Sequence, residues 1–149
     1  MEIERKFLVN ELPENLECFE RKKIAQGYLC TDPVVRIRRS NEDYYLTYKG
    51  KGLMVREEYN LPLTKDAYEH LLMKIDGRLI EKTRYLIPLR DNLTAELDVF
   101  EGELAPLTLV EVEFENVESA NAFQPPKWFG EDVTGSGKYQ NSTLSQRDC

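Results

Sequence analysis

Eight short segments of this chain alternate apolar side chains with polar or ionised ones at every second position. In the first of them, Glu2, Glu4 and Lys6 alternate with Ile3 and Phe7. Because successive side chains of a β-strand point to opposite faces, such a segment predicts a strand with one charged and one apolar face. Turn residues separate the segments, which is typical of an antiparallel sheet or barrel. The segments cover residues 2–9, 22–30, 34–39, 43–49, 54–61, 81–89, 94–100 and 107–115.

One segment of helical periodicity interrupts the strands and covers residues 65–75. Thr64 is its predicted N-cap and Gly77 its stop. Its apolar stripe indicates packing against a sheet. Two shorter helices are expected, over residues 119–123 and near residues 141–146.

The composition limits the class of protein. A chain of 149 residues with 41% hydrophobic and 32% charged residues fits one globular domain over residues 1–149. A net charge of −7 disfavours a nucleic-acid partner. No apolar stretch is long enough to span a membrane, and the charged N-terminus is unlike a signal peptide, so we expect a cytoplasmic protein without a membrane partner.

Cysteine and histidine are too few for several kinds of site. Cys18, Cys30 and Cys149 have no CxxC spacing, so we expect ordinary thiols and neither a disulfide framework nor a zinc site. The single histidine, His70, is expected on the surface of the predicted helix. The sequence therefore disfavours both a Ser-His-Asp triad and a histidine metal site.

The charged faces are clustered by sign, which an ordinary solvated strand face would not require. Residues i and i+2 of a strand lie roughly 7 Å apart. Two like charges at that distance repel by roughly 2.4 kcal/mol at an effective dielectric constant of about 20. A half-buried sheet with its polar side in water is the simpler interpretation of any one strand. The repeated clustering instead favours counter-ligands for Glu2/Glu4, Glu96/Asp98, Glu111/Glu113, Arg36/Arg38 and Lys82/Arg84.

Each sign of charge indicates its own kind of ligand. Carboxylates favour a hard divalent cation, Mg²⁺ or Mn²⁺, and arginine and lysine favour a polyanion such as phosphate. An eight-stranded barrel can hold one small ligand. The expected fold is therefore a mainly β (α+β) protein, a closed eight-stranded antiparallel β-barrel with flanking helices, its charged faces inward and its apolar faces outward. The predicted inward set contains the acids Glu2, Glu4, Glu58, Glu96, Asp98, Glu111 and Glu113 and the bases Lys6, Arg36, Arg38, Lys49, Arg56, Lys82 and Arg84.

The opening Glu2-x-Glu4-x-Lys6 pattern resembles the signature of the CYTH superfamily, the triphosphate tunnel metalloenzymes. This family includes class IV adenylyl cyclases, thiamine triphosphatases and inorganic triphosphatases, and its fold is an eight-stranded antiparallel tunnel. One departure is visible: many relatives carry a further basic residue where this chain has Leu8. The resemblance extends in order through Arg36-x-Arg38, Tyr48-Lys49, Glu57-Glu58, Lys82-x-Arg84-Tyr85, Glu96-x-Asp98, Glu111-x-Glu113 and Gly137-Lys138-Tyr139-x-Asn141.

The resemblance implies roles for these residues. Glu2, Glu4 and either Glu111 or Glu113 would hold the catalytic metal, with Glu96, Asp98 or Glu58 supporting a second. Lys138 and Tyr139 would close one end of the tunnel. The implied triphosphate-binding set is Lys6, Arg36, Arg38, Lys49, Arg56, Lys82, Arg84 and Lys138.

The implied reaction is metal-assisted hydrolysis of a terminal phosphoanhydride. Glu4 and Lys6 would take part in catalysis, and Glu58, Asp98 or Glu113 would orient the water. Because no nucleobase or thiamine pocket is evident, we favour tripolyphosphate as substrate, with nucleoside triphosphates such as ATP and GTP as additional ones. Adenylyl cyclase, thiamine triphosphatase and a non-catalytic polyphosphate- or nucleotide-binding module are the alternatives. Monomer and homodimer both stay open.

Overall fold

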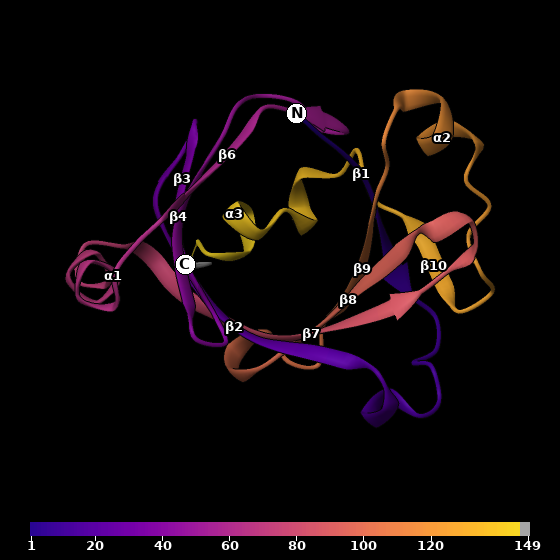
Figure 1. Cartoon of the computed structure of the whole chain (residues 1–149), viewed down its shortest axis with the longest axis horizontal. Coiled ribbons are helices and arrows are strands. Elements are labelled where there is room, and N and C mark those ends of the chain that lie inside the picture. The colour runs from indigo at the N-terminus through magenta and orange to yellow at the C-terminus, as the bar shows by residue number, and fades with distance from the viewer. Residues whose placement is uncertain (147–149) are drawn as a thin grey trace.

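The computed structural model describes residues 1–146, so Cys149 lies outside the described residues. Its strands surround a central lumen (Figure 1). Three helices accompany them: α1 (Lys65–Leu72), α2 (Val117–Ala122) and α3 (Asn141–Leu144). The strands are β1 (Glu2–Val9), β2 (Glu20–Thr31), β3 (Val34–Ser40), β4 (Asp43–Lys49), β5 (Val55–Arg56), β6 (Glu58–Pro62), β7 (Asp76–Pro88), β8 (Thr94–Phe100), β9 (Thr108–Glu113) and β10 (Phe129–Asp132).

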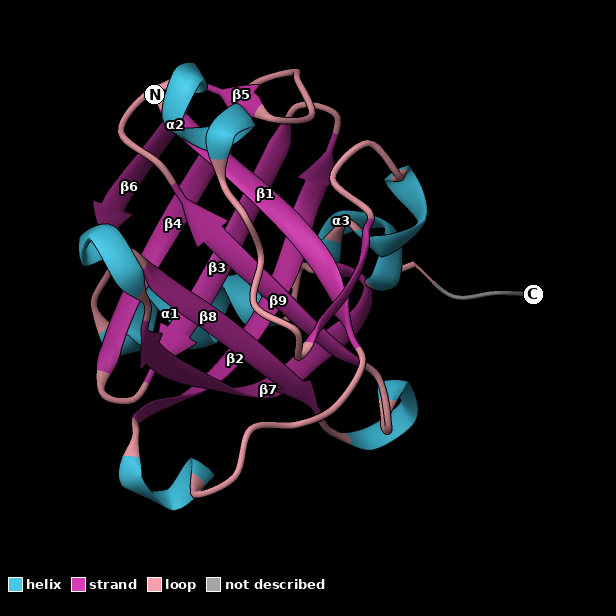
Figure 2. Ribbon diagram, turned by 90° about the vertical axis from the view of Figure 1, so that its right-hand side faces the viewer, coloured by secondary structure: helices cyan, strands magenta, loops and turns pink. Residues whose placement is uncertain are grey.

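Antiparallel pairing connects the strands in the order β10-β1-β9-β8-β7-β2-β3-β4-β6. Figure 2 shows β1, β9, β8 and β7 side by side along this path. The barrel nearly closes because the short β5 pairs with β1 and β6, directly after it, pairs with β4. The predicted antiparallel barrel is thus confirmed; it is nearly closed, its fifth predicted strand is interrupted at Glu57, and β10 is added to the predicted strands.

The apolar faces of the strands point away from the lumen, which confirms the inverted arrangement expected from the sequence. The main core cluster includes Leu97, Val110 and Val112, all completely buried on the outer side of β8 and β9. Ala120 of α2 and Phe129 of β10 cover this face, and aromatic rings stack beside them. Burial of such large side chains stabilises each by roughly 1.5–3 kcal/mol, which holds the barrel wall together from outside.

A second cluster lies inside the barrel, toward one end. It contains Tyr28, Val34, Ile80, Phe100 and Leu109, which share the inward faces of their strands with the charged residues. Tyr139 and Leu144 of the C-terminal segment pack against it, and Figure 1 shows α3 within the ring of strands. The lumen is therefore apolar toward one end and ionised elsewhere.

The helices differ modestly from the expectation. The side chain of Thr64 accepts a hydrogen bond from the Ala67 amide, as the N-cap prediction requires, but α1 ends at Leu72 and not at residue 75. Ile75 instead packs on β2 at Gly27, where a Cβ atom would lie 2.6 Å from the Ile75 side chain. Glycine is therefore required at that strand position for the chain to approach so closely.

β10 has no counterpart among the predicted strands. Its four residues are too few to show an alternation, and they follow Pro125 and Pro126, which suggested a loop. The predicted strand 107–115 ends earlier, at Glu113.

Several surface features agree with the sequence. His70 is exposed on α1, and Cys18 and Cys30 are exposed free thiols. Within residues 1–146, no helix has the length and apolarity needed to cross a bilayer.

Candidate active site

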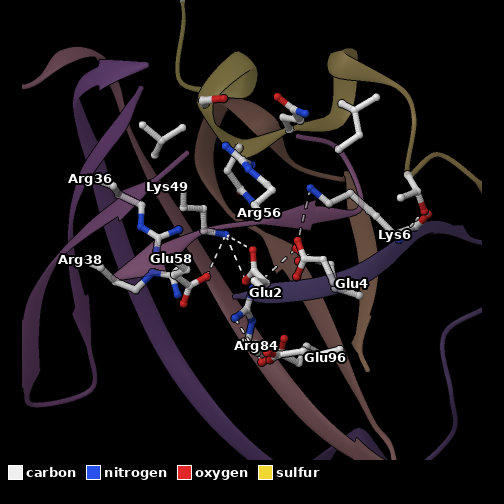
Figure 3. Close-up of a pocket in the computed structure, with 18 of the residues that line it drawn as sticks. Glu2, Glu4, Lys6, Arg36, Arg38, Lys49, Arg56, Glu58, Arg84 and Glu96 are labelled. Carbon is white, nitrogen blue, oxygen red and sulfur yellow. Dashed lines mark hydrogen bonds and ion pairs between the residues drawn. The ribbon is translucent and has the colours of Figure 1, made fainter. Parts of the chain in front are cut away.

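The inward faces of the strands enclose a cavity of about 370 Å³. Figure 3 shows side chains from β1, β3, β4, β7 and β8 directed into it. Twelve of the residues predicted to form the site line this cavity: Glu2, Glu4, Lys6, Arg36, Arg38, Lys49, Arg56, Glu58, Arg84, Glu96, Glu111 and Glu113.

Lys82 and Asp98 do not line the cavity, although both belong to the predicted set. They are completely buried and ion-paired, with Lys82 Nζ 2.7 Å from Asp98 Oδ2. Arg84 binds both carboxylate oxygens of Asp98, through Nε at 2.7 Å and a terminal nitrogen at 2.9 Å. Burial lowers the pKa of Lys82 to about 7 despite Asp98, and the charges of Arg84 and Arg38 act in the same direction. Asp98 therefore holds Arg84 from a buried position beside the cavity, on the inward face of β8.

Lys138 is also placed outside the cavity. It is exposed, with its ammonium 5.4 Å from the ring centroid of Tyr139. The neighbouring backbone does reach the site, because Lys6 Nζ donates a hydrogen bond to the Tyr139 carbonyl at 3.0 Å. The segment around α3 thus borders the cavity through Gln140, Asn141 and Ser142 rather than through Lys138.

Carboxylates face one another across the strands of one wall. Glu4 of β1 is the register partner of Glu113 of β9, and Glu96 of β8 is the partner of Glu111. Like charges in such cross-strand positions are destabilising. Among residues 1–146, no basic side chain lies within ion-pair distance of Glu4 or Glu113.

The acids of this wall have shifted pKa values. Burial raises the pKa of Glu4 well above its usual range, and the charges of Glu111 and Glu2 add to the effect. For Glu111 burial acts in the same direction, but the charges of Lys6 and Arg84 hold its pKa well below the usual range. A buried pair of neighbouring acids thus divides into one that favours its proton and one that stays ionised.

A second acid pair joins Glu2 of β1 to Glu58 of β6. Burial and a hydrogen bond with Glu58 raise the pKa of Glu2 to about 7. Burial alone would raise the pKa of Glu58, but the hydrogen bond with Glu2 and the charge of Lys49 lower it to about 2. Lys49 Nζ lies between them, 2.9 Å from Glu2 and 3.4 Å from Glu58 (Figure 3).

These carboxylates suit a divalent cation in their chemistry. They are hard oxygen donors, and neither cysteine nor histidine lies among the residues around the cavity. In their present rotamers, no three Asp, Glu, His or Cys side chains of residues 1–146 lie close enough together to hold an ion. The donor set therefore fits Mg²⁺ or Mn²⁺, and the side chains would have to turn toward the ion.

Arg36 and Arg38 of β3 have no acid partner within the described chain, unlike Lys6, Lys49 and Arg84. A terminal nitrogen of Arg36 donates to Thr47 Oγ1 at 3.1 Å, while its buried Nε has no partner. Arg38 donates from Nε to Gln26 Oε1 at 2.7 Å. Burial, and then the positive charges of Arg36 and Arg84, lower the pKa of Arg38 to about 9. Uncompensated guanidinium groups in an enclosed cavity favour an anionic ligand.

Some lining residues were not predicted from the sequence. Lys22 lies on the inward face of β2 but is followed there by Ile24 and Gln26, so this strand shows no like-charge pair. Asn60 of β6 also lines the cavity and donates to Glu58 at 2.8 Å. The residues that α3 and its flanks contribute follow no strand alternation, so only the folded chain reveals them.

Fold and cavity together define a class of protein: an antiparallel barrel whose lumen, rather than its outer face, carries the ionised side chains. A family model of the CYTH domain matches residues 1–145. The chain therefore belongs to the CYTH domain family.

Named relatives support this assignment over nearly the whole chain. The chain is 44% identical over 147 residues to an inorganic triphosphatase of Nitrosomonas europaea, covering 97% of this chain and 96% of that protein. It is 34% identical over 149 residues to an inorganic triphosphatase of Acetivibrio thermocellus, covering 96% and 92%. A crystal structure of an inorganic triphosphatase matches with a TM-score of 0.74 and 41% identity, covering 99% of this chain and 96% of that one.

Proposed function

We propose that this protein is a divalent-metal-dependent triphosphatase that hydrolyses inorganic tripolyphosphate to pyrophosphate and phosphate. The observation that carries the proposal is the pair Arg36 and Arg38, which are directed into an enclosed cavity without a carboxylate partner in the described chain. The names of the two curated relatives support the same reaction. ATP and GTP are proposed as additional substrates.

The bases of the cavity bind and orient the substrate. Arg36, Arg38 and Arg56 bind phosphate oxygens directly, because none of them is neutralised by an acid of the described chain. Lys6, Lys49 and Arg84 stabilise the charge that develops on the leaving pyrophosphate. Together these groups hold the terminal phosphorus in line with the attacking water.

The acids hold the metal and the water. When bound, Mg²⁺ or Mn²⁺ held by Glu2, Glu4 and either Glu111 or Glu113 would polarise the phosphoryl oxygens. We assign the orientation of the water to Glu113, because Glu58 is already engaged by Lys49 and Asn60. The water attacks the terminal phosphorus, the bond to pyrophosphate breaks, and the carboxylate accepts the proton of the water.

The setting of the enzyme is part of the proposal. We propose a single catalytic domain over residues 1–149 that acts in the cytoplasm. The net charge of −7 disfavours a nucleic-acid partner, and the small lumen suits a small-molecule triphosphate.

The deciding experiment measures phosphate release from tripolyphosphate, pyrophosphate, ATP, GTP and thiamine triphosphate, each with Mg²⁺ and with Mn²⁺. We expect the highest kcat/KM on tripolyphosphate and none without metal. Cyclic AMP as the main product from ATP would instead make the protein a cyclase, and a higher kcat/KM on thiamine triphosphate would make it a thiamine triphosphatase. Absence of metal-dependent turnover on every triphosphate would leave only a binding module.

An arginine comparison locates the activity in the cavity. We expect Arg36→Met to lower kcat/KM on tripolyphosphate by about 10- to 100-fold, because a charged hydrogen bond contributes roughly 1.5–3 kcal/mol. Arg21→Met is the matched control, since Arg21 is exposed at the other face of β2. Equal losses in both variants would contradict the assignment of the cavity.

A further inference from the structure

The cations of the cavity differ in the kind of group that holds them. Lys49 and Arg84 are held by carboxylates, which also offset their charge. Arg38 is held by a neutral amide, because its Nε donates to Gln26 Oε1 at 2.7 Å. Arg36 is held similarly by the hydroxyl of Thr47. A neutral acceptor fixes the direction of a guanidinium and leaves its charge for a ligand.

Gln26 is completely buried in the middle of β2. It is the register partner of Arg38 on β3 and of Ile80 on β7, and it does not itself line the cavity. A guanidinium can only donate hydrogen bonds, so the amide oxygen of Gln26 must face Arg38. Gln26 therefore lies beside Arg38 on the inward face of the barrel, buried next to the cavity without lining it.

Packing alone does not account for an amide at this position. With its oxygen facing Arg38, the Gln26 Nε2 is buried without a hydrogen-bond partner among residues 1–146. Leaving a buried donor unpaired is unfavourable, and an apolar side chain of similar length would fill the same space without it. What glutamine supplies is the oxygen toward Arg38.

We propose that Gln26 is a positioning residue that fixes the guanidinium of Arg38 for the triphosphate while keeping its full charge available. This inference rests on the proposed function of the cavity. Arg38 lies near the like charges of Arg36 and Arg84, which would otherwise drive it out of position. A carboxylate at position 26 would hold Arg38 equally well but would cancel the charge that the substrate needs.

The test compares two near-isosteric variants by steady-state kinetics on tripolyphosphate with Mg²⁺. We expect Gln26→Glu to raise KM about 10- to 100-fold with a much smaller change in kcat, because the new carboxylate competes with the substrate for Arg38. We expect Gln26→Met to raise KM about 5- to 20-fold, because the guanidinium loses its anchor. In an Arg38→Met background, Gln26→Met should change KM less than twofold, since the group it positions is absent.

Controls separate this inference from the proposed function. Ser40→Ala removes a buried hydroxyl from the same strand as Arg38 without touching the Gln26–Arg38 hydrogen bond, and it should keep the wild-type KM. If the wild type does not hydrolyse tripolyphosphate, the proposed function itself is wrong. If the wild type is active and both Gln26 variants, shown folded by thermal unfolding, keep its KM, the role of Gln26 alone is refuted. A full effect of Gln26→Met in the Arg38→Met background would also refute it.

Discussion

Asp98 shows how a single side chain can matter to the site without entering it. It is predicted as a metal ligand or a water-orienting base, but in the structure it is buried beside the cavity with Lys82 and Arg84 as partners. Both partners are basic groups of the predicted triphosphate-binding set. Its removal would leave two buried cations without a counter-charge, so its contribution lies first in the stability of the wall.

At this scale we expect Asp98→Asn to lower the free energy of unfolding by about 3–5 kcal/mol, because it breaks a buried ion pair from one side. Urea unfolding followed by circular dichroism measures this. Glu101→Gln is the matched control, since it removes the exposed ion pair with Lys23 and should cost less than about 1 kcal/mol. Similar losses of unfolding free energy in the two variants would show that the buried ion pairs of Asp98 stabilise the fold no more than an exposed ion pair does.

Glu4 illustrates the opposite case, an acid that the metal-free fold does not favour. It faces Glu113 across the strands, and no base of the described residues pairs with it. We therefore expect Glu4→Gln to keep or raise the melting temperature of the metal-free protein and to abolish the rise that Mg²⁺ gives the wild type. Thermal unfolding with EDTA and with Mg²⁺ checks both parts. A variant that retains the Mg²⁺-dependent rise would exclude Glu4 as a metal ligand.

Among the elements, β10 pairs with β1 in the sheet, and one outward side chain of β1 adds to this contact. Arg5 donates to Asp132 at 2.8 Å and to the carbonyls of Ala120 and Phe123, and its guanidinium lies 5.0 Å from the ring centroid of Phe7. Arg5 lies between Glu4 and Lys6 in the sequence, so alternation predicts it on the outer face, and the structure confirms this. Arg5 therefore joins β1, α2 and β10 and has no part in the cavity.

We expect Arg5→Met to lower the free energy of unfolding by about 1.5–3 kcal/mol, the range for hydrogen bonds to charged groups. Its KM for tripolyphosphate should stay within twofold of the wild type at a temperature where both are folded. Thermal unfolding and steady-state kinetics measure the two effects. A large rise in KM without loss of stability would contradict the assignment of Arg5 to the packing of β10 rather than to the cavity.

The link between β10 and β1 should also depend on pH. Burial opposes ionisation of Asp132, but hydrogen bonds from Thr134 and Arg5 lower its pKa below the ordinary value of 3.8. An acid with a lowered pKa in the folded state stabilises the protein above its unfolded pKa, and this contribution is lost as the pH falls through the folded value. Asp132→Asn should therefore lower the free energy of unfolding more at pH 6 than at pH 3. The difference should be modest, because the Asp132 side chain is 41% exposed. Equal destabilisation at the two pH values would contradict it.

Alternation along each strand was enough to predict most of the site, because it determines the face of every residue. It placed Glu2, Glu4 and Lys6 inward and Arg5 outward without any structure. It could not predict burial: Lys82 shares the inward face of Arg84 but is completely buried beside the cavity, which depends on the packing of neighbouring strands and of the C-terminal segment. It also missed the inward residues after β10, since short or irregular segments carry no period.

At the scale of the whole molecule, the barrel is built from partners far apart in the chain. β1 pairs with β9 and β10, and the hydrogen bonds from Arg5 to Asp132 join residues 127 positions apart. Such pairings form slowly, because closing a long loop costs conformational entropy before the strands gain any stabilising contact. A nascent chain therefore carries Glu2 and Glu4 long before Glu111 and Glu113 are synthesised, and it cannot bring these acids opposite one another until β9 has formed. Chains that end before β9 are thus expected to be inert toward triphosphates, so activity during synthesis would show that β9 has docked on β1.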